Sequence, residues 1–288
     1  MARSNYEYPG YDREGPTYWS KTLLLYATVT FGALWMTLPL WWTLTTSLSA
    51  SPTAATVSFF PANFTFDNYI QLWERPDIPL VRWFVNTIVF AGGVTLFNLA
   101  FDALAGYALA KVDFWGREVL FLAFISTMMI PAMVTMIPVY ILLSELNWIN
   151  TYQGLIAPLA AGPFGIFLLR QHFKSLPSSL GDAAKIDGCN EFQAFYKVYL
   201  PLAKPALATL GIFTFMGAWN NFQWPIIIAT SNEMYTLPVA IFAVRNQYFA
   251  EWGLMMAAAT IIVLPVIVVF LSAQKYFIRG MSLSGMKG

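Results

Sequence analysis

The sequence predicts an all-α membrane protein with six transmembrane helices. Of its 288 residues, 58% are hydrophobic and only 11% are charged, and the mean hydropathy is +0.57. A soluble domain usually has about 25% charged residues with which to cover its surface. The few charges here are also separated by long uncharged gaps, and a helix needs roughly 20 apolar residues to cross a bilayer. Both observations place the chain in a membrane.

The gaps between charged residues locate the six spans. The first is expected at about 22–46, and the second lies between 82 and 111, interrupted only by Asp102. Prolines fall within most of the spans, and each removes a backbone donor and favours a kink. The fourth span is the most interrupted, by Pro158, Gly162 and Pro163. The remaining four spans are expected within residues 119–144, 146–169, 205–232 and 252–274.

The distribution of Lys and Arg predicts the orientation, because these residues are retained on the cytoplasmic side of a membrane. With the N-terminus inside, thirteen of the 16 Lys and Arg residues fall in cytoplasmic segments. The three exceptions are Arg75, Arg82 and Arg245. Both termini are therefore expected in the cytoplasm. We interpret residues 1–20 as a cytoplasmic tail rather than a cleaved signal, and residues 21–288 as one six-span domain.

The composition nearly excludes several kinds of chemistry. One cysteine, Cys189, and one histidine, His172, are too few for a disulfide, a zinc cluster or a Cys–His nucleophile pair. The sequence has no G-x-x-x-x-G-K-[ST] phosphate-binding loop, so we expect no ATP hydrolysis by this chain. A net charge of +1 gives no overall field that would attract nucleic acid. We therefore expect no bound cofactor or metal and no enzymatic activity.

A polar segment at 170–204 separates the fourth and fifth spans and holds eight charged residues. Ser179, followed three residues later by Asp182, indicates a helix start in which side chains satisfy free backbone donors. Gly188 indicates where this helix ends, because glycine readily takes a left-handed conformation. Residues 190–193 repeat the start signal. The second helix would carry an apolar stripe that needs a packing partner, formed by Phe192, Phe195, Tyr196 and Tyr199.

This polar segment resembles a family motif. It follows the E-A-A-x-x-x-G-x9-I-x-L-P loop of the membrane subunits of binding-protein-dependent ABC importers, with complete spacing. Asp182 stands where that family usually has Glu, and Val198 where it usually has Ile. Both changes keep the chemistry, although the shorter Asp182 needs a closer partner. The matching residues are Asp182, Ala183, Ala184, Asp187, Gly188, Leu200 and Pro201.

The resemblance covers most of the chain and is greatest for carbohydrate-type permeases, in particular for the second permease subunit of maltose-type systems. It implies the type I ABC importer permease fold and a multi-pass location in a bacterial or archaeal inner membrane. Blocks similar to those permeases lie in the spans, in the outer loops and in the tail, at residues 64–69, 105–110, 129–131, 219–225, 236–239 and 275–280.

The resemblance also implies partners. In that family, two related permease subunits form the pathway, a pair of ATPase subunits uses ATP and Mg²⁺ to drive it, and an extracytoplasmic protein delivers the solute. This chain would then form half of a sugar or oligosaccharide pathway. Its polar segment would dock on an ATPase, with Ala183 and Ala184 allowing close approach, Asp182 facing a basic group and Gly188 setting the angle between the helices. A helix cap alone is the alternative role for Asp182.

Candidate substrate residues lie in span five. Asn220 and Asn221 offer amides to sugar hydroxyls, and Trp219 and Trp224 offer aromatic faces to a sugar ring. The alternative is structural, because Asn also joins helices and Trp also anchors at the interface. The intramembrane Asp102 is a further candidate for the pathway. Its alternative role is also structural, held by neighbouring polar side chains and backbone groups.

Other functions stay open at this point. The solute could be a polyol or a sugar-phosphate-like compound. A proton-coupled carrier would need several ionisable groups within the spans, and Asp102 alone makes a poor relay. A membrane enzyme would need a reactive constellation at the bilayer surface, which the sequence does not offer.

Overall fold

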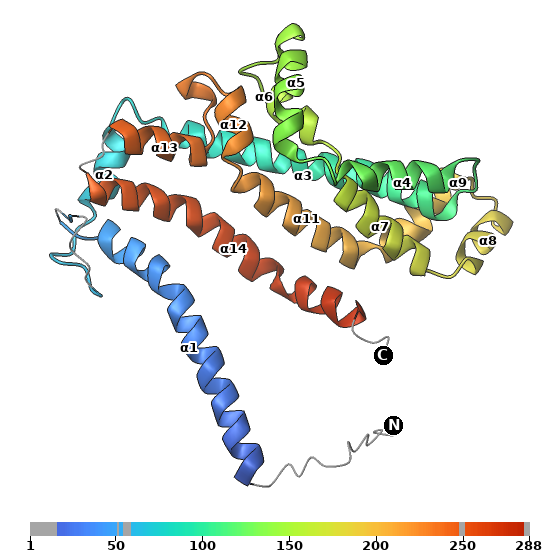
Figure 1. Cartoon of the computed structure of the whole chain (residues 1–288), viewed down its shortest axis with the longest axis horizontal. Helices are drawn as coiled ribbons and strands as arrows, with labels where there is room; N and C mark the ends of the chain where they lie inside the picture. The colour runs from blue at the N-terminus through green and yellow to red at the C-terminus, as the bar shows by residue number, and fades with distance from the viewer. Residues whose placement is uncertain (1–15, 51, 54–58, 248–250, 285–288) are drawn as a thin grey trace.

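The computed structural model describes residues 16–50, 52–53, 59–247 and 251–284. These residues form helices and connecting loops, and the described part has no β-strand beyond an isolated bridge between Ser49 and Phe64. The helices lie along one elongated body from which α1 and α5 project (Figure 1). The all-α prediction is therefore confirmed for the described residues.

Three helices are long and apolar enough to cross a membrane alone. They are α1 (Pro16–Ser47), α3 (Leu80–Lys111) and α14 (Trp252–Ser284), and they match the first, second and sixth predicted spans. Helix α1 begins inside the predicted tail, because a proline is well tolerated in the first helical turn. Residues 1–15 of that tail lie outside the described residues, as does part of the C-terminal segment.

The third and fourth predicted spans are each broken. Helices α4 (Arg117–Thr127) and α5 (Ala132–Glu145) meet at a bend of 97°, and α6 (Tyr152–Ile156) with the 3-10 turn η1 (Ala157–Leu159) meets α7 (Pro163–Ser175) at 44°. Pro131 and Pro163 lie at these two breaks, where a missing N–H and a fixed φ stop the incoming helix. A third bent pair, Glu191–Leu202 and Lys204–Trp219, meets at 79°, and the described residues give up to six spans if each of the three pairs counts as one.

Span five is shorter than predicted. Helix α11 (Lys204–Trp219) ends at Asn220, and a separate short helix, α12 (Gln223–Ile228), follows it. The predicted range 205–232 therefore holds α11 and, after a break, α12. The side chain of Asn221, which precedes the N-cap residue Phe222, accepts the backbone N–H of Trp224 in the first turn of α12 at 3.1 Å.

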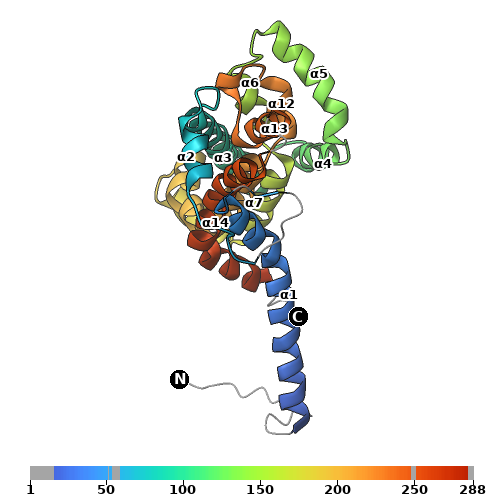
Figure 2. The same cartoon turned by 90° about the vertical axis from the view of Figure 1, so that its left-hand side faces the viewer.

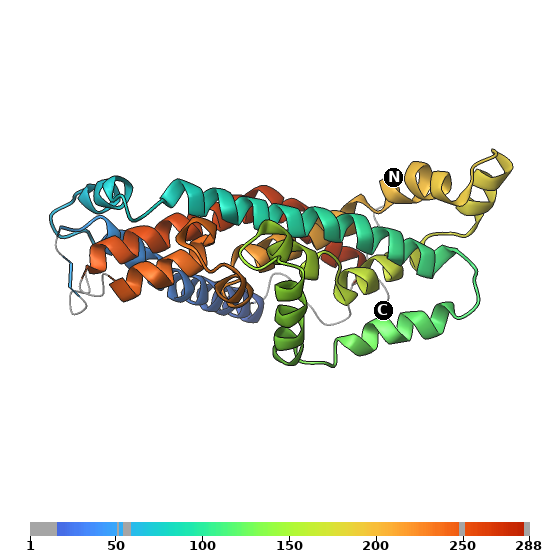
Figure 3. The ribbon, with the colours of Figure 1, turned by 90° about the horizontal axis from the view of Figure 1, so that it is seen from above.

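Shorter elements gather at the two ends of the body (Figures 1 and 3). One end, here called the α2 end, carries α2 (Asp67–Glu74), η3 (Asn232–Met234) and α13 (Leu237–Gln247). The other, called the α8 end, carries α8 (Ser179–Ile186), α9 (Glu191–Ala194), the π turn η2 (Phe195–Tyr199) and α10 (Leu200–Leu202).

Helix α3 lies at the centre of the packing. Its α2 half joins a large core that includes Trp83, Phe90, Trp219 and Leu237, and its α8 half joins a smaller core built on Tyr107. Helices α7 and α11 pack along α3, whereas α1 packs mainly on α14 and diverges from it toward its own N-terminus (Figures 1 and 2). The end of α1 also bonds to α2, through Ser47 Oγ and the Tyr69 hydroxyl at 2.7 Å. Helix α5 stands away from the body (Figure 2).

Candidate functional site

The loop predicted from the family motif forms a compact helical hairpin at the α8 end. Helix α8 ends at Ile186, and the φ of +79° at Gly188, two residues later, is left-handed, as predicted. Two hydrogen bonds close this end: Gly188 N donates to Lys185 O at 3.0 Å, and Cys189 N donates to Ala184 O at 2.9 Å. This is the pairing of a Schellman motif, which fixes the direction in which the chain leaves the helix.

The two helix starts of the hairpin differ. Asn190 and Gln193 form the predicted capping box, with Gln193 N donating to Asn190 Oδ1 at 2.8 Å and Asn190 N donating to Gln193 Oε1 at 3.0 Å. The start of α8 lacks such a cap: its N-cap residue is Ser178, which accepts no hydrogen bond through its side chain. The predicted side-chain capping at Ser179 and Asp182 is therefore wrong, although the helix does begin at Ser179.

The motif residues present a mostly exposed surface. Asp182, Ala183, Asp187 and Gly188 are exposed, and the neighbouring Ile186 has 86% of its surface accessible. An aliphatic side chain so fully exposed, flanked by two free carboxylates, is suited to a partner surface. Of the other motif residues, Ala184 is buried against the hairpin, Leu200 is half-buried and Pro201 is exposed.

The base of the hairpin is aromatic. Phe195 and Tyr199 are buried against Tyr107 of α3, with ring centroids 5.1 and 5.2 Å from its ring. Phe192 and Tyr196 remain about two-thirds exposed, at 66% and 64%. The expected four-residue stripe therefore packs through only two of its members. The π turn η2 accounts for the change, because its wider turn shifts the helical register from Phe195 onward.

Polar contacts tie the hairpin to the α8 end of α3. Glu191 accepts the Tyr107 hydroxyl at 3.1 Å and pairs with Lys185 Nζ at 2.9 Å, so it joins α3, α8 and α9. Lys111 Nζ donates to Leu176 O at 2.7 Å, where the chain leaves α7. The hydrogen bond with Lys185 holds the pKa of Glu191 below its usual value, and the same bond raises the pKa of Lys185.

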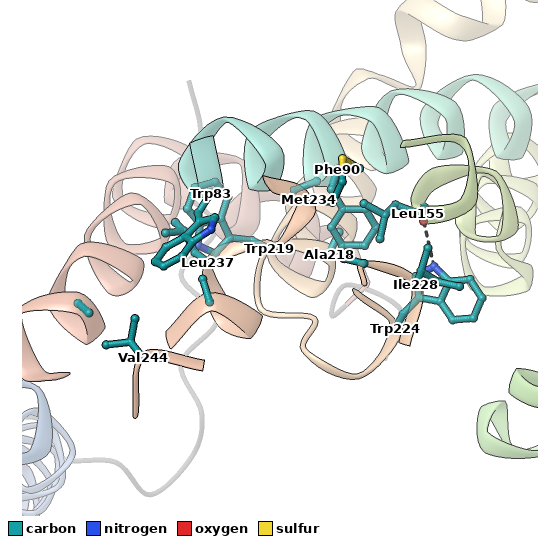
Figure 4. Packing of buried hydrophobic residues seen from close by; sticks show 14 of the residues in the cluster. Trp83, Phe90, Leu155, Ala218, Trp219, Trp224, Ile228, Met234, Leu237 and Val244 are labelled. Atoms are coloured by element: carbon teal, nitrogen blue, oxygen red, sulfur yellow. Dashed lines mark hydrogen bonds between the residues drawn. The ribbon is translucent and has the colours of Figure 1, made fainter. Parts of the chain in front are cut away.

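Two of the four span-five candidates, Trp219 and Trp224, lie in the large core (Figure 4). Trp219 is buried, and its indole donates to Ile262 O at 3.2 Å; Trp224 is buried, and its indole donates to Leu155 O at 3.1 Å. Asn220 is exposed and donates to Met216 O of its own helix. The two indole rings therefore pack within the core. Asn221 and Trp224 border a hollow of about 200 Å³ between α5 and α12.

Asp102 is fully buried and bonds to backbone. Its Oδ1 accepts Gly162 N at 3.0 Å, at the free N-terminal end of α7, and one turn away Asn98 Nδ2 donates to Leu159 O at 2.6 Å. These side chains satisfy backbone groups that the break before α7 leaves without helical partners. Gly165 permits the approach, because a Cβ there would overlap the Asp102 carboxylate. The Oδ1 contact fits the structural alternative for Asp102, whereas its Oδ2 is buried with no hydrogen-bond partner among the described residues.

A comparison with protein-family models decides what this arrangement belongs to. Residues 102–283 match the family described as binding-protein-dependent transport system inner membrane component. The chain belongs to this family. It is therefore the permease component of a binding-protein-dependent ABC importer, and the resemblance drawn from its polar loop is confirmed.

Individual relatives agree with this assignment. The permease is 38% identical over 228 residues to the arabinooligosaccharides transport system permease protein AraQ of Bacillus subtilis, covering 79% of this chain and 81% of that protein. It is 31% identical to the lactose transport system permease protein LacG of Rhizobium radiobacter, covering 90% and 94%. A solved bacterial ABC transporter involved in the import of the acidic polysaccharide alginate has a chain with a TM-score of 0.81 and 25% identity, covering 94% of the permease and 100% of that chain.

Two polar contact sets of the permease were not found from its sequence. At the α2 end, Asn86 donates to Glu233 O at 2.7 Å and to Tyr235 O at 2.9 Å, and it accepts the Tyr152 hydroxyl at 2.6 Å. At the α8 end, buried Arg170 bonds to Glu118 of α4. An Asn within an apolar span was a usable signal for the first set. The sequence offers no such signal for Arg170 and Glu118, because a charge beside an apolar segment marks a span boundary whatever it pairs with.

No metal-binding group emerges in the part of the chain that the structure describes, where no three His, Cys, Asp or Glu side chains are grouped suitably.

Proposed function

We propose that this permease forms half of the translocation pathway for an oligosaccharide, with the α8 end in the cytoplasm. In this proposal both termini are also cytoplasmic, the membrane is that of a bacterium or archaeon, and a second related permease supplies the other half. An ATPase pair binds ATP and Mg²⁺ and docks on the α8 hairpin. A solute-binding protein delivers the sugar at the α2 end.

The observation that carries the proposal is the shape of the α8 hairpin. Its outer surface exposes Ile186 between two carboxylates, while its base is held to α3 by aromatic packing and by Glu191. A partner that moved this surface would therefore move α3 as well as α7 and α11, which the hairpin connects. The Schellman turn at Gly188 keeps the two short helices at one angle, so the hairpin moves as a unit.

The sugar class rests on the relatives, whose names give arabinooligosaccharides and lactose as solutes. Within this chain, Asn221 and Gln223 at the hollow between α5 and α12 are the amides best placed for hydroxyl groups. Asn220 could reach a solute only on the exposed side of α11. We assign Trp219 and Trp224 to packing rather than to solute contact, because their indole N–H groups bond to backbone. We assign Asp102 to the break before α7, where its Oδ1 accepts Gly162 N.

The test uses the whole importer in proteoliposomes, with the partner permease, the ATPase and the binding protein. Uptake of labelled arabinooligosaccharide, lactose and raffinose is measured beside ATP hydrolysis. Gly188→Pro removes the left-handed turn and the N–H bonded to Lys185 O, so we expect transport and stimulated ATPase activity to be lost while the protein still inserts. Cys189→Ala, at the next position, is the matched control and should transport normally.

Two results would contradict the proposal. Unchanged uptake by the Gly188→Pro importer would remove the coupling role of the hairpin. Calorimetry that showed no sugar binding to the partner solute-binding protein, with tight binding of a different solute, would remove the oligosaccharide class.

A further inference from the structure

Arg170 is a buried cation on α7 that joins three helices. Only 4% of its side-chain surface is accessible. Its Nε donates to Leu109 O of α3 at 3.0 Å, and its Nη2 lies 2.7 and 2.8 Å from the two carboxylate oxygens of Glu118 on α4. Its guanidinium also lies 3.7 Å from the centroid of the Phe121 ring. An arginine so placed has several directional bonds that fix its position.

The ion pair is favourable because its two charges are solvated differently. Glu118 keeps 59% of its side-chain surface accessible, so its carboxylate loses little hydration when it binds Arg170. Pairing two fully buried charges often gains nothing, because both must lose water. Here only the arginine is buried, and its donors find the Leu109 carbonyl and the Glu118 carboxylate.

Helix α4 has few other attachments to the body. Its buried face is a small apolar cluster in which Phe121 meets Leu109 and Ile166. Much of the rest of α4 is exposed, including Val119 at 72% and Leu122 at 61%. The Arg170–Glu118 ion pair is therefore the polar contact that joins α4 to α7.

Helix α4 leads directly to the candidate pathway. After the 97° bend it continues as α5, which projects from the body (Figures 1 and 2). Ala132, Thr135 and Met136 of α5 form one wall of the hollow that Asn221 borders. A displacement of α4 would therefore change the shape of this hollow.

We propose that Arg170 is a positioning residue that carries movement of the α8 hairpin, through Glu118, to α4 and then to α5. Arg170 lies about 8 Å along α7 from its last residue, Ser175, where the hairpin segment begins. This inference rests on the proposed docking of an ATPase on the hairpin. It adds a route from that docking site to the wall of the pathway.

The test measures two distances by spin labelling in the assembled importer, with Cys189→Ala as the background. One label pair, Leu122→Cys with Leu96→Cys, reports α4 against the middle of α3. The second pair, Tyr196→Cys with Leu96→Cys, reports the hairpin against the same point. All three labelled side chains are well exposed, at 61%, 66% and 64%. Both distances are measured without nucleotide and after trapping with ATP and vanadate.

The deciding variant is Glu118→Gln, which keeps the size of the side chain and removes its charge. We expect the hairpin distance to change on trapping as in the wild type, the α4 distance to stay constant, and the sugar transported per ATP to fall about tenfold. Asp113→Asn is the matched control, because it removes a nearby carboxylate that pairs with Arg117, at 2.7 Å, instead of with Arg170. That control should behave as the wild type in both distances.

A wild-type change of the α4 distance in the Glu118→Gln importer would overturn this inference and leave the proposed docking intact. Absence of both shifts in the wild-type importer would instead contradict the docking itself, and the inference with it. If Glu118→Gln fails to assemble, the neutral pair Arg170→Gln with Glu118→Gln replaces it. Failure of that double variant to assemble would show a purely structural role and would likewise overturn the inference.

Discussion

Asn86 and Glu191 hold opposite ends of α3 to the rest of the chain, and they do so with different chemistry. Asn86 has no accessible surface and bonds to two backbone carbonyls and a tyrosine hydroxyl, all neutral groups. Glu191 is exposed and pairs with Lys185, which is also exposed. Buried neutral bonds have one geometry and a high cost of breaking, whereas an exposed ion pair is weak and can rearrange.

The neighbours of these residues follow the same division. At the α2 end, Trp83 Nε1 donates to Asn232 O at 2.8 Å, and Thr87 Oγ1 accepts Leu237 N at 2.8 Å. The segment from α12 to α13 is thus fixed by side chains of α3. At the α8 end, the hairpin is held to α3 by aromatic packing and by Glu191, and Lys111 Nζ donates to Leu176 O before it. The permease therefore has one end fixed by buried neutral hydrogen bonds and one end held by aromatic packing and exposed charged groups, which fits the proposed movement of the hairpin.

The largest expected effect is at the fixed end. Asn86→Leu would leave two carbonyls and the Tyr152 hydroxyl buried without their partner, so we expect the free energy of unfolding to fall by about 3 kcal/mol. Chemical denaturation in detergent measures the loss. Asn220→Leu, at an exposed amide, should stay within about 0.5 kcal/mol of the wild type. Equal losses in the two variants would refute the idea of a fixed α2 end.

An intermediate effect is expected between the two ends, where Asp102 caps α7. A methyl group in Gly165→Ala would overlap the Asp102 carboxylate, so we expect the free energy of unfolding to fall by about 2 kcal/mol. Gly92→Ala, on α3 with no atom near its Cβ, should raise it by about 0.5 kcal/mol instead. A stabilising Gly165→Ala would mean that α7 and α3 adjust easily at this contact.

The smallest effect is expected at the α8 end and depends on pH. The bond to Lys185 lowers the pKa of Glu191 in the folded protein, so the stabilising effect of this bond is fully present above the unfolded pKa and is lost as the pH falls through the lower, folded pKa. Hydrogen exchange of residues 185–194, corrected for intrinsic rates, should show faster opening of the hairpin at a pH below the folded pKa than at neutral pH. Glu191→Gln should show no such change, and a pH-dependent opening that persisted in it would assign the effect to another group.

Much of the α8 hairpin could be predicted from the sequence. The left-handed turn at Gly188 and the capping box at Asn190 depend on residues close together in the chain, so their signals are local. The fate of the apolar stripe was less predictable, because the π turn at Phe195–Tyr199 moves Tyr196 out to solvent. The exposure of Ile186 also depends on how α8 packs against α9.

The membrane spans were likewise only partly predictable from the sequence. Their existence follows from the gaps between charges, because burying a charge in hydrocarbon is costly at any position. Their breaks were predictable as kinks at Pro131 and Pro163, although the sequence does not give the angles of 97° and 44°. Those angles depend on which neighbours satisfy the backbone groups that each proline frees.

The sequence by itself determined the membrane class, the apolar segments and the loop that identifies the family, because each rests on composition or on residues within one turn or loop. The tertiary structure alone decided that Asp102 bonds to Gly162, 60 residues away, and that Asn86 bonds to Tyr235, 149 residues away. It also buried the Trp219 side chain in the core and brought Glu118 into an ion pair with Arg170. A polar side chain within an apolar helix must find a partner, and only the packing of distant helices determines which partner it meets.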